Sequence, residues 1–444
     1  MTASEEQRLT GYVEQLTGGR VVKVKRLARW RPAWFIDVEH DGGLLRLHAR
    51  GDRRSDVLPF PSLEREAAIL RVLEEHGVPV PHVHGMCPDP LAIVMTAVPG
   101  RRDVTTLPVP ERTAVAQEYV DLLARMHTID VGAFAAIGLD VPSTPEGIGL
   151  GMLEAYLPLY ARVKAAPEPL IEFAIAWARR NVPRNRPRAA FVHWDAGQFL
   201  HDDGRITALY DFETCLVGDP MMDLAALRLR DPAEPLGADL GHLFRRYESA
   251  SGVPLDVAAL RFHTVVFALV GVMALAGSRV DPQPGAPHLE YLWWDLMQRR
   301  ALVWALAECV GVVIDRPAPP DPRPTAAGPL LAMLGDAVQQ LPAATGHDRY
   351  QQQALAVLVR CVARGDAVRE ELDHATQQER LALLDRPSDE PALALEALVR
   401  AAGPERDAEL VQCFAREVER EVFLLEPVAD RVAGYDLTPV VLSG

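Results

Sequence analysis

The chain is poor in the features that mark secreted and membrane proteins. It has five scattered cysteines among 444 residues and no Cys-x-x-Cys pair, which argues against a disulfide framework or a cysteine zinc site and fits a reducing cytoplasm. Residues 1–8 contain no basic stretch leading into an apolar one, so we expect no secretory signal. The longest apolar run, Thr264 to Gly277, is too short to span a bilayer and predicts a buried helix. We therefore expect a soluble cytoplasmic protein with no membrane partner.

The chain also lacks an excess of basic residues. Its 46 Lys and Arg against 61 Asp and Glu give a formal net charge of −15. This balance argues against nucleic acid as the main partner, because nucleic-acid-binding proteins generally need a basic surface. ATP is not excluded, since its phosphates need only a local cluster of cations. With 49% hydrophobic residues, the chain is long enough to bury a large core and to form two or three domains.

Two carboxylates flank one predicted hairpin. Residues 199–201 and 206–210 are strand-like, and Asp203-Gly204 between them favours a tight turn because it accepts positive φ. The hairpin brings together the segments on either side of it, which carry Asp195 and Asp211. One carboxylate that takes a hydroxyl proton and another that holds Mg²⁺ are the protein groups that phosphoryl transfer from ATP most needs.

The same stretch holds a series of spaced motifs. His193 and Asp195 form a His-x-Asp pair, Asp211 and Glu213 form an Asp-x-Glu pair, and residues 218–224 are Gly-Asp-Pro-Met-Met-Asp-Leu. In this order the motifs resemble those of the aminoglycoside phosphotransferase and choline kinase superfamily, and within it the small-molecule phosphotransferases that include hydroxyacyl-CoA kinase-like domains. The resemblance covers about residues 15–315. It implies an α+β, protein-kinase-like bilobal fold with a small antiparallel β lobe and a larger helical lobe.

The resemblance also implies roles for these residues. Asp195 would orient and deprotonate an acceptor hydroxyl, His193 would brace its loop, and Asp211 would hold Mg²⁺ against ATP. The superfamily has a metal-binding Asn after the catalytic Asp, whereas here the loop is two residues shorter and Gln198 takes that place. Gln offers the same amide oxygen on a longer stem. Three further polar residues are expected to make structural hydrogen bonds: Asp219, Asp223 and His127.

A small β lobe is predicted before this site. Strand-like segments at residues 21–27, 34–39 and 44–50 precede a helix at residues 62–75. The resemblance places Arg50 on the third strand as the phosphate-binding cation and Glu66 on the helix as its partner. A last strand, residues 91–98, would run into the hinge and carry the adenine hydrogen bonds on the backbone near Met95 to Val98.

The loop expected to cover the phosphates departs from the pattern. Residues 28–33 contain no glycine, although glycine is what lets backbone N–H groups approach a phosphate closely. Arg29 and Arg31 are candidates to supply positive charge instead.

Four regions are predicted along the chain. Residues 1–98 form the nucleotide-binding lobe and residues 99–315 the helical lobe with the catalytic loop. The proline-rich segment 316–328 cannot continue a helix and is assigned as a linker. Residues 329–444 show helical spacing and are expected to form a tail domain. On this division, truncation after Asp315 should leave a soluble protein that still binds ATP.

The acceptor and the activity are left open between several alternatives. The main hypothesis is a kinase for the hydroxyl of a small molecule: an antibiotic, a sugar, an amino alcohol or a hydroxyacyl compound. The acidic chain favours a cationic acceptor, whereas Trp194 beside the base favours a hydrophobic one. Trp293-Trp294 are assigned to aromatic packing in preference to an acceptor pocket. The alternatives are a catalytically weak nucleotide-binding regulatory protein and an accessory kinase of acyl-CoA metabolism.

Overall fold

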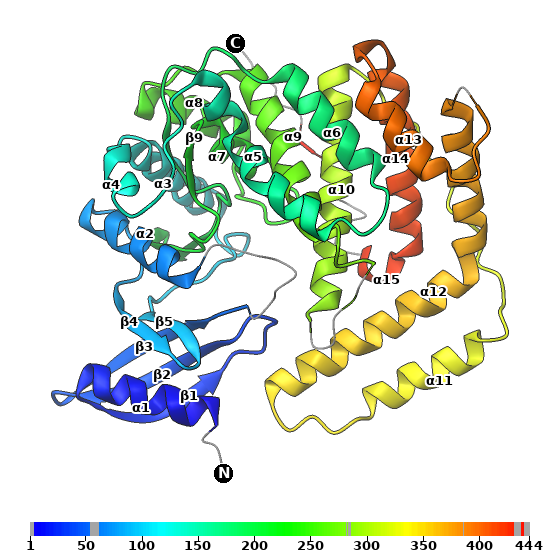
Figure 1. Cartoon of the computed structure of the whole chain (residues 1–444). Coiled ribbons are helices and arrows are strands. Elements are labelled where there is room, and N and C mark those ends of the chain that lie inside the picture. Colours follow the sequence, from blue (N-terminus) through cyan, green and yellow to red (C-terminus); the bar gives the residue numbers. More distant parts are fainter. Residues whose placement is uncertain are drawn as a thin grey trace.

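The computed structural model describes residues 4–53, 62–280, 282, 286–384, 386–429 and 437–438. Within them the chain forms a small lobe with an antiparallel sheet, a larger helical lobe and a helical C-terminal region (Figure 1). The bilobal α+β fold predicted from the sequence is therefore confirmed.

The small lobe is one five-stranded antiparallel sheet covered by helices. The strand order is β1-β2-β3-β5-β4. Alternating residues of β2 and β3 are buried, among them Ile36, Val38 and Leu47, and Leu9 and Val13 of α1 pack against this face. The elements of this lobe are α1 (Glu5–Thr17), β1 (Arg20–Arg26), β2 (Ala33–His40), β3 (Gly43–Gly51), α2 (Leu63–Glu75), β4 (Val83–Pro88) and β5 (Leu91–Thr96).

Helix α2 follows the third strand in the chain, as predicted. Its first residue follows Ser62, whose hydroxyl accepts a hydrogen bond from the N–H of Arg65 at 3.3 Å and so caps the helix. Its apolar residues are buried on one face, and Glu66 lies on that same face with 2% exposure. A buried carboxylate needs a cationic partner, and β3 supplies one.

The helical lobe surrounds two small two-stranded sheets, β6-β9 and β7-β8. In the β7-β8 hairpin Asp203 and Gly204 have φ of 46° and 72°, which confirms the predicted turn. The elements are α3 (Val109–Met126), α4 (Val131–Ala135), α5 (Pro145–Val163), α6 (Pro169–Asn181), β6 (Ala190–Val192), β7 (Phe199–Asp202), β8 (Arg205–Leu209), β9 (Leu216–Gly218), α7 (Met221–Arg230), α8 (Leu240–Ser251), α9 (Val257–Leu275) and α10 (His288–Val310).

The longest apolar run belongs to α9, the central helix of this lobe. Among the described residues α9 alone is long and apolar enough to cross a membrane by length and composition, and 72% of its apolar window is buried within the protein. It contacts α5, α6, α7 and α10. The run therefore forms a core helix, as predicted.

The C-terminal region is helical, and beside a small cluster of its own around Val368, Leu372 and Leu424 it packs into the core of the helical lobe. Residues 312–327 contain no helix, and in the described residues five α-helices and one short 3-10 helix, Pro404–Arg406, follow. Leu395, Leu410 and Phe414 share one hydrophobic cluster with Phe173 and Leu302 of the helical lobe. The domain boundaries stay a prediction, but the expected separable tail is at odds with this packing. The helices are α11 (Gly328–Gln339), α12 (Gly346–Leu383), α13 (Pro391–Ala401), α14 (Asp407–Leu424) and α15 (Glu426–Ala429).

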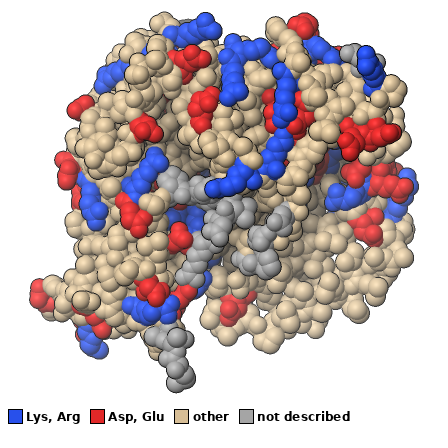
Figure 2. Space-filling view, in the orientation of Figure 1, with Lys and Arg blue, Asp and Glu red and all other residues tan. Residues whose placement is uncertain are grey.

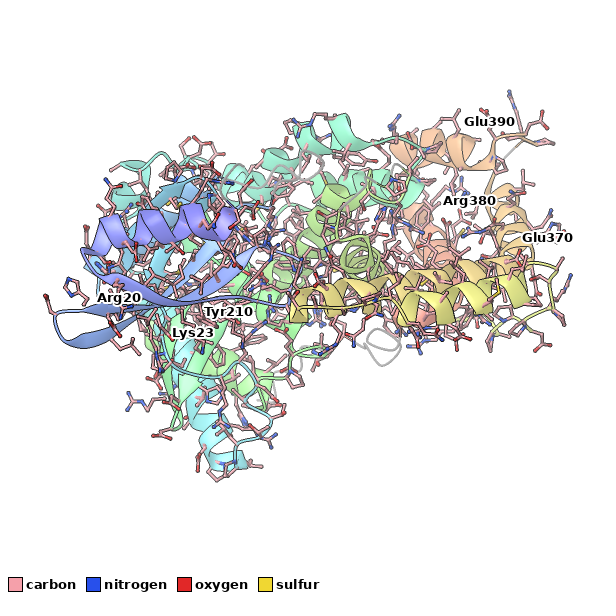
Figure 3. All side chains as sticks on the ribbon, turned by 90° about the horizontal axis from the view of Figure 1, so that it is seen from below. Arg20, Lys23, Tyr210, Glu370, Arg380 and Glu390 are labelled. Carbon is pink, nitrogen blue, oxygen red and sulfur yellow. The ribbon has the colours of Figure 1, made fainter. Side chains whose placement is uncertain are left out.

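Helices α11 and α12 form a hairpin that extends back toward the small lobe (Figures 1 and 3). No residue of α11 is buried, and Leu330, Met333 and Leu334 are exposed. This helix carries one acidic and no basic residue, and the lower right of Figure 2, where it lies, is almost free of charged side chains. At the far end of the hairpin a Cβ built on Gly346 would lie 3.8 Å from Ala28 Cβ of the small lobe.

Because α14 fills the core of the helical lobe, we expect its loss to unfold that lobe. Phe414 is 1% exposed, and its ring centroid lies 5.6 Å from that of Phe173. The substitution Phe414→Ala should lower the free energy of unfolding by about 3–5 kcal/mol. The matched control Leu330→Ala, at a site 63% exposed on α11, should change it by less than about 0.5 kcal/mol. Urea unfolding measures both.

A chain ending at residue 315 should aggregate, because it would expose the surface that α13 and α14 cover. A soluble, cooperatively unfolding product of this truncation would contradict the shared core.

Candidate active site

A cavity of about 600 Å³ lies between the two lobes. It contains seven of the eight residues predicted to form the site, and the eighth, His193, lies buried beneath the cavity wall. The sequence prediction therefore identified one contiguous place in the fold. The seven residues are Arg50, Glu66, Met95, Val98, Asp195, Gln198 and Asp211.

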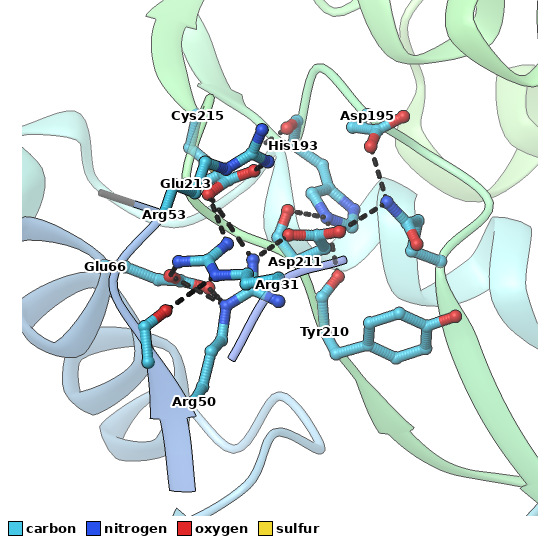
Figure 4. Close-up of polar contacts among 12 residues, drawn as sticks. Arg31, Arg50, Arg53, Glu66, His193, Asp195, Tyr210, Asp211, Glu213 and Cys215 are labelled. Carbon is cyan, nitrogen blue, oxygen red and sulfur yellow. Dashed lines mark hydrogen bonds and ion pairs between the residues drawn. The ribbon is translucent and has the colours of Figure 1, made fainter. Parts of the chain in front are cut away.

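Arg50 joins the small lobe to the end of the β7-β8 hairpin (Figure 4). Its Nε donates to Glu66 Oε2 at 3.2 Å, and its Nη2 is paired with Asp211 Oδ1. Burial alone would raise the pKa of Asp211, but the guanidinium of Arg50 holds that pKa well below its usual range. Asp211 is therefore a carboxylate at every physiological pH. The Arg50–Glu66 pair implied by the resemblance is present.

The loop that carries Asp195 is held by hydrogen bonds from below. Asp223 of α7 accepts from the backbone N–H groups of His193 at 3.0 Å and Trp194 at 2.8 Å. His127 contacts the same carboxylate at 2.9 Å. Trp194 has φ of 64°, a conformation that non-glycine residues adopt only when their surroundings hold them. Asp223 and His127 therefore make the structural contacts expected of them.

His193 braces the loop from the other side. Its Nε2 lies 3.1 Å from the carbonyl oxygen of Tyr210 and 3.3 Å from that of Asp211. Burial lowers the pKa of this ring, so it is neutral near neutral pH and donates from Nε2. His193 thus ties the Asp195 loop to the Asp211 loop, and its ring stacks on Phe212 rather than facing the cavity.

Gln198 stands between the two carboxylates. Its Nε2 donates to Asp195 Oδ2 at 2.5 Å and to Asp211 Oδ2 at 2.9 Å, so the shortened loop still reaches both. One amide nitrogen therefore bridges the two carboxylates.

The donor set here fits a hard cation. Asp211 offers a carboxylate, and rotation of the Gln198 amide would present Oε1 where Nε2 now lies. In the part of the chain that the structure describes, no group of three or more His, Cys, Asp or Glu residues could hold a metal ion. Mg²⁺ needs no such cage, because it is usually bound by one or two protein oxygens together with substrate phosphates and water.

Sequence reasoning named Arg31 as a cation but not its partner, and it missed Arg53 and Arg230. Glu213 accepts from Arg31 at 2.7 Å and is also paired with Arg53 (Figure 4), so both residues of the Asp-x-Glu motif receive cations from the small lobe. Arg230, the last residue of α7, is paired with Asp195 Oδ1 and donates from Nε to the carbonyl oxygen of Ala196 at 2.9 Å. No local pattern indicates that the end of this helix returns to the catalytic loop.

The two predicted hinge residues differ in what their backbones offer. Met95 lies on β5 opposite His48 of β3, so its backbone belongs to the sheet and its side chain contributes to the cavity wall. Within the described residues the N–H and C=O of Val98 make no hydrogen bond. Burial, aided by Arg50, lowers the pKa of His48 to about 4, so this part of the wall is uncharged at neutral pH.

The opposite half of the cavity is mostly apolar. Trp194 stacks on Phe267 with ring centroids 4.9 Å apart, and both line the wall. Trp293 and Trp294, assigned from the sequence to aromatic packing, also line it. The apolar wall is completed by residues of α7, α9 and α10, among them Leu229, Val270, Ala274 and Met297.

Comparisons with known proteins agree with this geometry. A family model described as "Phosphotransferase enzyme family" matches residues 24–262. Human acyl-CoA dehydrogenase family member 11 is 25% identical over 241 residues, which are 50% of this chain and 30% of that protein. Mouse acyl-CoA dehydrogenase family member 10 is 26% identical over 210 residues, 44% of this chain and 19% of that protein. The chain therefore spans less than a third of the length of these curated relatives.

Solved structures share the fold. The crystal structure of a candidate aminoglycoside phosphotransferase from Ralstonia eutropha JMP134 aligns with a TM-score of 0.50 and 19% identity, covering 68% of this chain and 98% of that one.

Asp223 should be among the most sensitive positions. Asp223→Ala leaves two buried N–H groups and His127 without their acceptor, so we expect a loss of about 3–5 kcal/mol in the free energy of unfolding. Asp121→Asn is the control, because Asp121 pairs with Arg246 at the surface and such pairs contribute at most about 1 kcal/mol. Equal unfolding free energies for the two variants would refute the bracing role.

Proposed function

The chain belongs to the phosphotransferase enzyme family, and from that premise we propose that it transfers the γ-phosphoryl group of ATP to a hydroxyl of a small molecule, with Mg²⁺ as the metal. The observation that carries the proposal is the contact of Gln198 with both Asp195 and Asp211. One amide nitrogen bridges the carboxylate paired with Arg230, that of Asp195, and the carboxylate paired with Arg50, that of Asp211. A base and a metal-binding carboxylate held next to each other in this way could act on the same transferred group.

Each residue of the site has one task in this proposal. Asp195 accepts the proton of the acceptor hydroxyl and orients its oxygen toward the phosphorus. Asp223 and His193 hold the loop that carries Asp195, so the base is fixed before the acceptor arrives. Arg50, positioned by Glu66, neutralises charge on the nucleotide phosphates.

Asp211 and Gln198 are the residues that would hold Mg²⁺. When bound, the ion would neutralise charge on the nucleotide phosphates. The backbone groups of Val98, which make no hydrogen bond within the described residues, would bind adenine, and the side chain of Met95 would support the ring.

The cavity also favours one kind of acceptor. Its wall away from the phosphate site is built mainly from Trp194, from apolar side chains of α9 and from Trp293, Trp294 and Met297 of α10, with Glu290 and Gln298 as its polar members on α10. Such a wall favours the binding of an acceptor that buries apolar surface against it. It disfavours ammonium groups, which would lose their hydration there. We therefore propose an alcohol with an apolar body rather than a polyamine, although the acidic chain by itself favours a cation.

Two alternatives each rest on one observation. The side-chain amide nitrogen of Gln198, and not its oxygen, faces Asp211. This orientation favours a catalytically weak nucleotide-binding regulatory protein. The relatives named for acyl-CoA dehydrogenases favour a kinase accessory to acyl-CoA metabolism, with a hydroxyacyl compound as the acceptor.

The proposed base is tested by Asp195→Asn. Phosphoryl transfer should fall by at least ~10², while ATP binding persists, because the lost interaction forms mainly with the reacting hydroxyl. Asp203→Asn, in the exposed hairpin turn, is the matched control and should keep full turnover. If the folded Asp195→Asn variant turns over like the parent, Asp195 has no part in the mechanism.

The metal ligands are tested by calorimetric titration of MgATP. Asp211→Ala should abolish Mg²⁺-dependent binding and Gln198→Ala should weaken it less, since an ionised carboxylate contributes more to a hard cation than a neutral amide. Titration of ATP with EDTA separates metal from nucleotide effects. A Gln198→Ala variant that binds MgATP like the parent would show that the shortened loop supplies no ligand, and would support the regulatory alternative.

A further inference from the structure

The loop between β1 and β2, residues 27–32, is fixed by a backbone hydrogen bond on one side of Arg29 and by the side chain of Arg31 on the other. On one side the N–H of Leu27 donates to Ala33 at 2.9 Å. On the other, Arg31 donates from Nε to the carbonyl oxygen of Gly51 at 2.8 Å and from Nη1 to Glu213 at 2.7 Å. The loop is thus anchored to both lobes without a glycine.

Trp30 adds a third anchor. Its ring meets Trp294 of α10 edge-on, with centroids 5.3 Å apart, and Arg53 lies over the same ring at 4.6 Å. With its neighbours held in this way, the loop has little freedom to bring its backbone N–H groups toward a phosphate.

Arg29 itself is directed into the cavity and has no partner there. No described residue offers a hydrogen bond or ion pair to its side chain, although the residue lines the cavity wall. By contrast, Arg31 and Arg53 are paired with Glu213, and Arg50 with Glu66 and Asp211.

The surroundings of Arg29 make the lack of an anion costly. Burial lowers the pKa of its guanidinium and neighbouring Arg50 lowers it further, whereas the carboxylate of Asp211 acts in the opposite direction. The lowered pKa shows that burial and the neighbouring cations outweigh this carboxylate, so the protonated guanidinium is destabilised when no ligand is bound. The same placement becomes favourable when a polyanion enters, because the field of all these arginines then acts on the ligand.

We propose that Arg29 binds the phosphates of the nucleotide and replaces the backbone N–H contacts that a glycine-containing loop would make. The inference rests on the proposed function, which supplies ATP as the ligand. A guanidinium can hold two phosphate oxygens at once, so one side chain does the work of two backbone donors. Its position next to Arg50 and Asp211 directs it to the β- and γ-phosphates rather than to adenine.

The test compares nucleotides that share adenine and differ in phosphate. ATP, ADP and adenosine are titrated in the calorimeter into the parent chain, Arg29→Gln, Arg29→Lys and the control Arg46→Gln. Arg46 is an exposed arginine of β3, 3.7 Å from Asp37. Arg29→Gln should weaken the binding of ATP and ADP about 10- to 100-fold, as expected for charge-assisted hydrogen bonds, and leave the affinity for adenosine unchanged. The ATP affinity of Arg29→Lys should fall between those of the parent and Arg29→Gln, and that of Arg46→Gln should equal the parent's.

A second readout separates ligand binding from a structural role. Without nucleotide, Arg29→Gln should unfold at the same temperature as the parent or higher, because it removes an unpaired cation. A lower Tm, or equal weakening of adenosine and ATP, would overturn the inference.

The outcomes also distinguish this inference from the proposed function. If the parent binds ATP and Arg29→Gln binds it equally well, the inference alone fails. If the parent binds ATP through Arg29 but phosphorylates no acceptor, the proposed reaction fails and Arg29 keeps its role. A parent chain that binds no nucleotide overturns both.

Discussion

Arg50 connects three elements that lie far apart in the sequence. From β3 it reaches Glu66 on α2 and Asp211 after β8, and Arg31 and Arg53 extend the network through Glu213. Removing one partner of a buried ion pair typically costs about 3–5 kcal/mol, because the other charge stays buried without compensation. The relative position of the lobes, the ionisation of Asp211 and the shape of the cavity all depend on this cluster. We infer that nucleotide phosphates and metal enter an arrangement already balanced by carboxylates.

The motifs predicted much of the site because the chemistry is local there. A turn that accepts positive φ closes the β7-β8 hairpin, and that hairpin helps to bring Asp195 near Asp211. The pairing of Arg50 with Glu66 was predicted from the family resemblance, which places a cation on the third strand and its carboxylate partner on the next helix. The role of Arg230 could not be predicted from the sequence, since its contact with Asp195 depends on how α7 packs against the loop. The edge strand β4 escaped notice because Gly85 and Pro88 interrupt any alternation, whereas the Ser4–Gln7 capping box of α1 was a signal present in the sequence.

The proline-rich segment 316–328 predicted a linker before a separate tail domain, and the packing of the tail differs from that prediction. Helix α10 ends at Val310 with Gly311 as its cap, and the proline-rich segment that follows separates it from α11 without separating two cores. Amphipathic helices bury their apolar face wherever a complementary surface exists, and α13 and α14 find theirs on α6 and α10. Arg300 and Glu419, both buried and 3.0 Å apart, join across that contact. The helical lobe of this chain is therefore larger than its phosphotransferase motifs indicate. Helices α11 and α12 extend it back toward the loop between β1 and β2.

The proposed reaction moves a phosphoryl group from ATP to an alcohol. Phosphorus NMR of the parent chain with ATP, Mg²⁺ and a panel of hydroxylated acceptors tests it directly. We predict that the γ-phosphate resonance disappears as ADP and a phosphomonoester resonance grow together, with acceptors of apolar body reacting fastest and no reaction without Mg²⁺. ATP that stays intact with every acceptor, or that yields only inorganic phosphate, would contradict the claim.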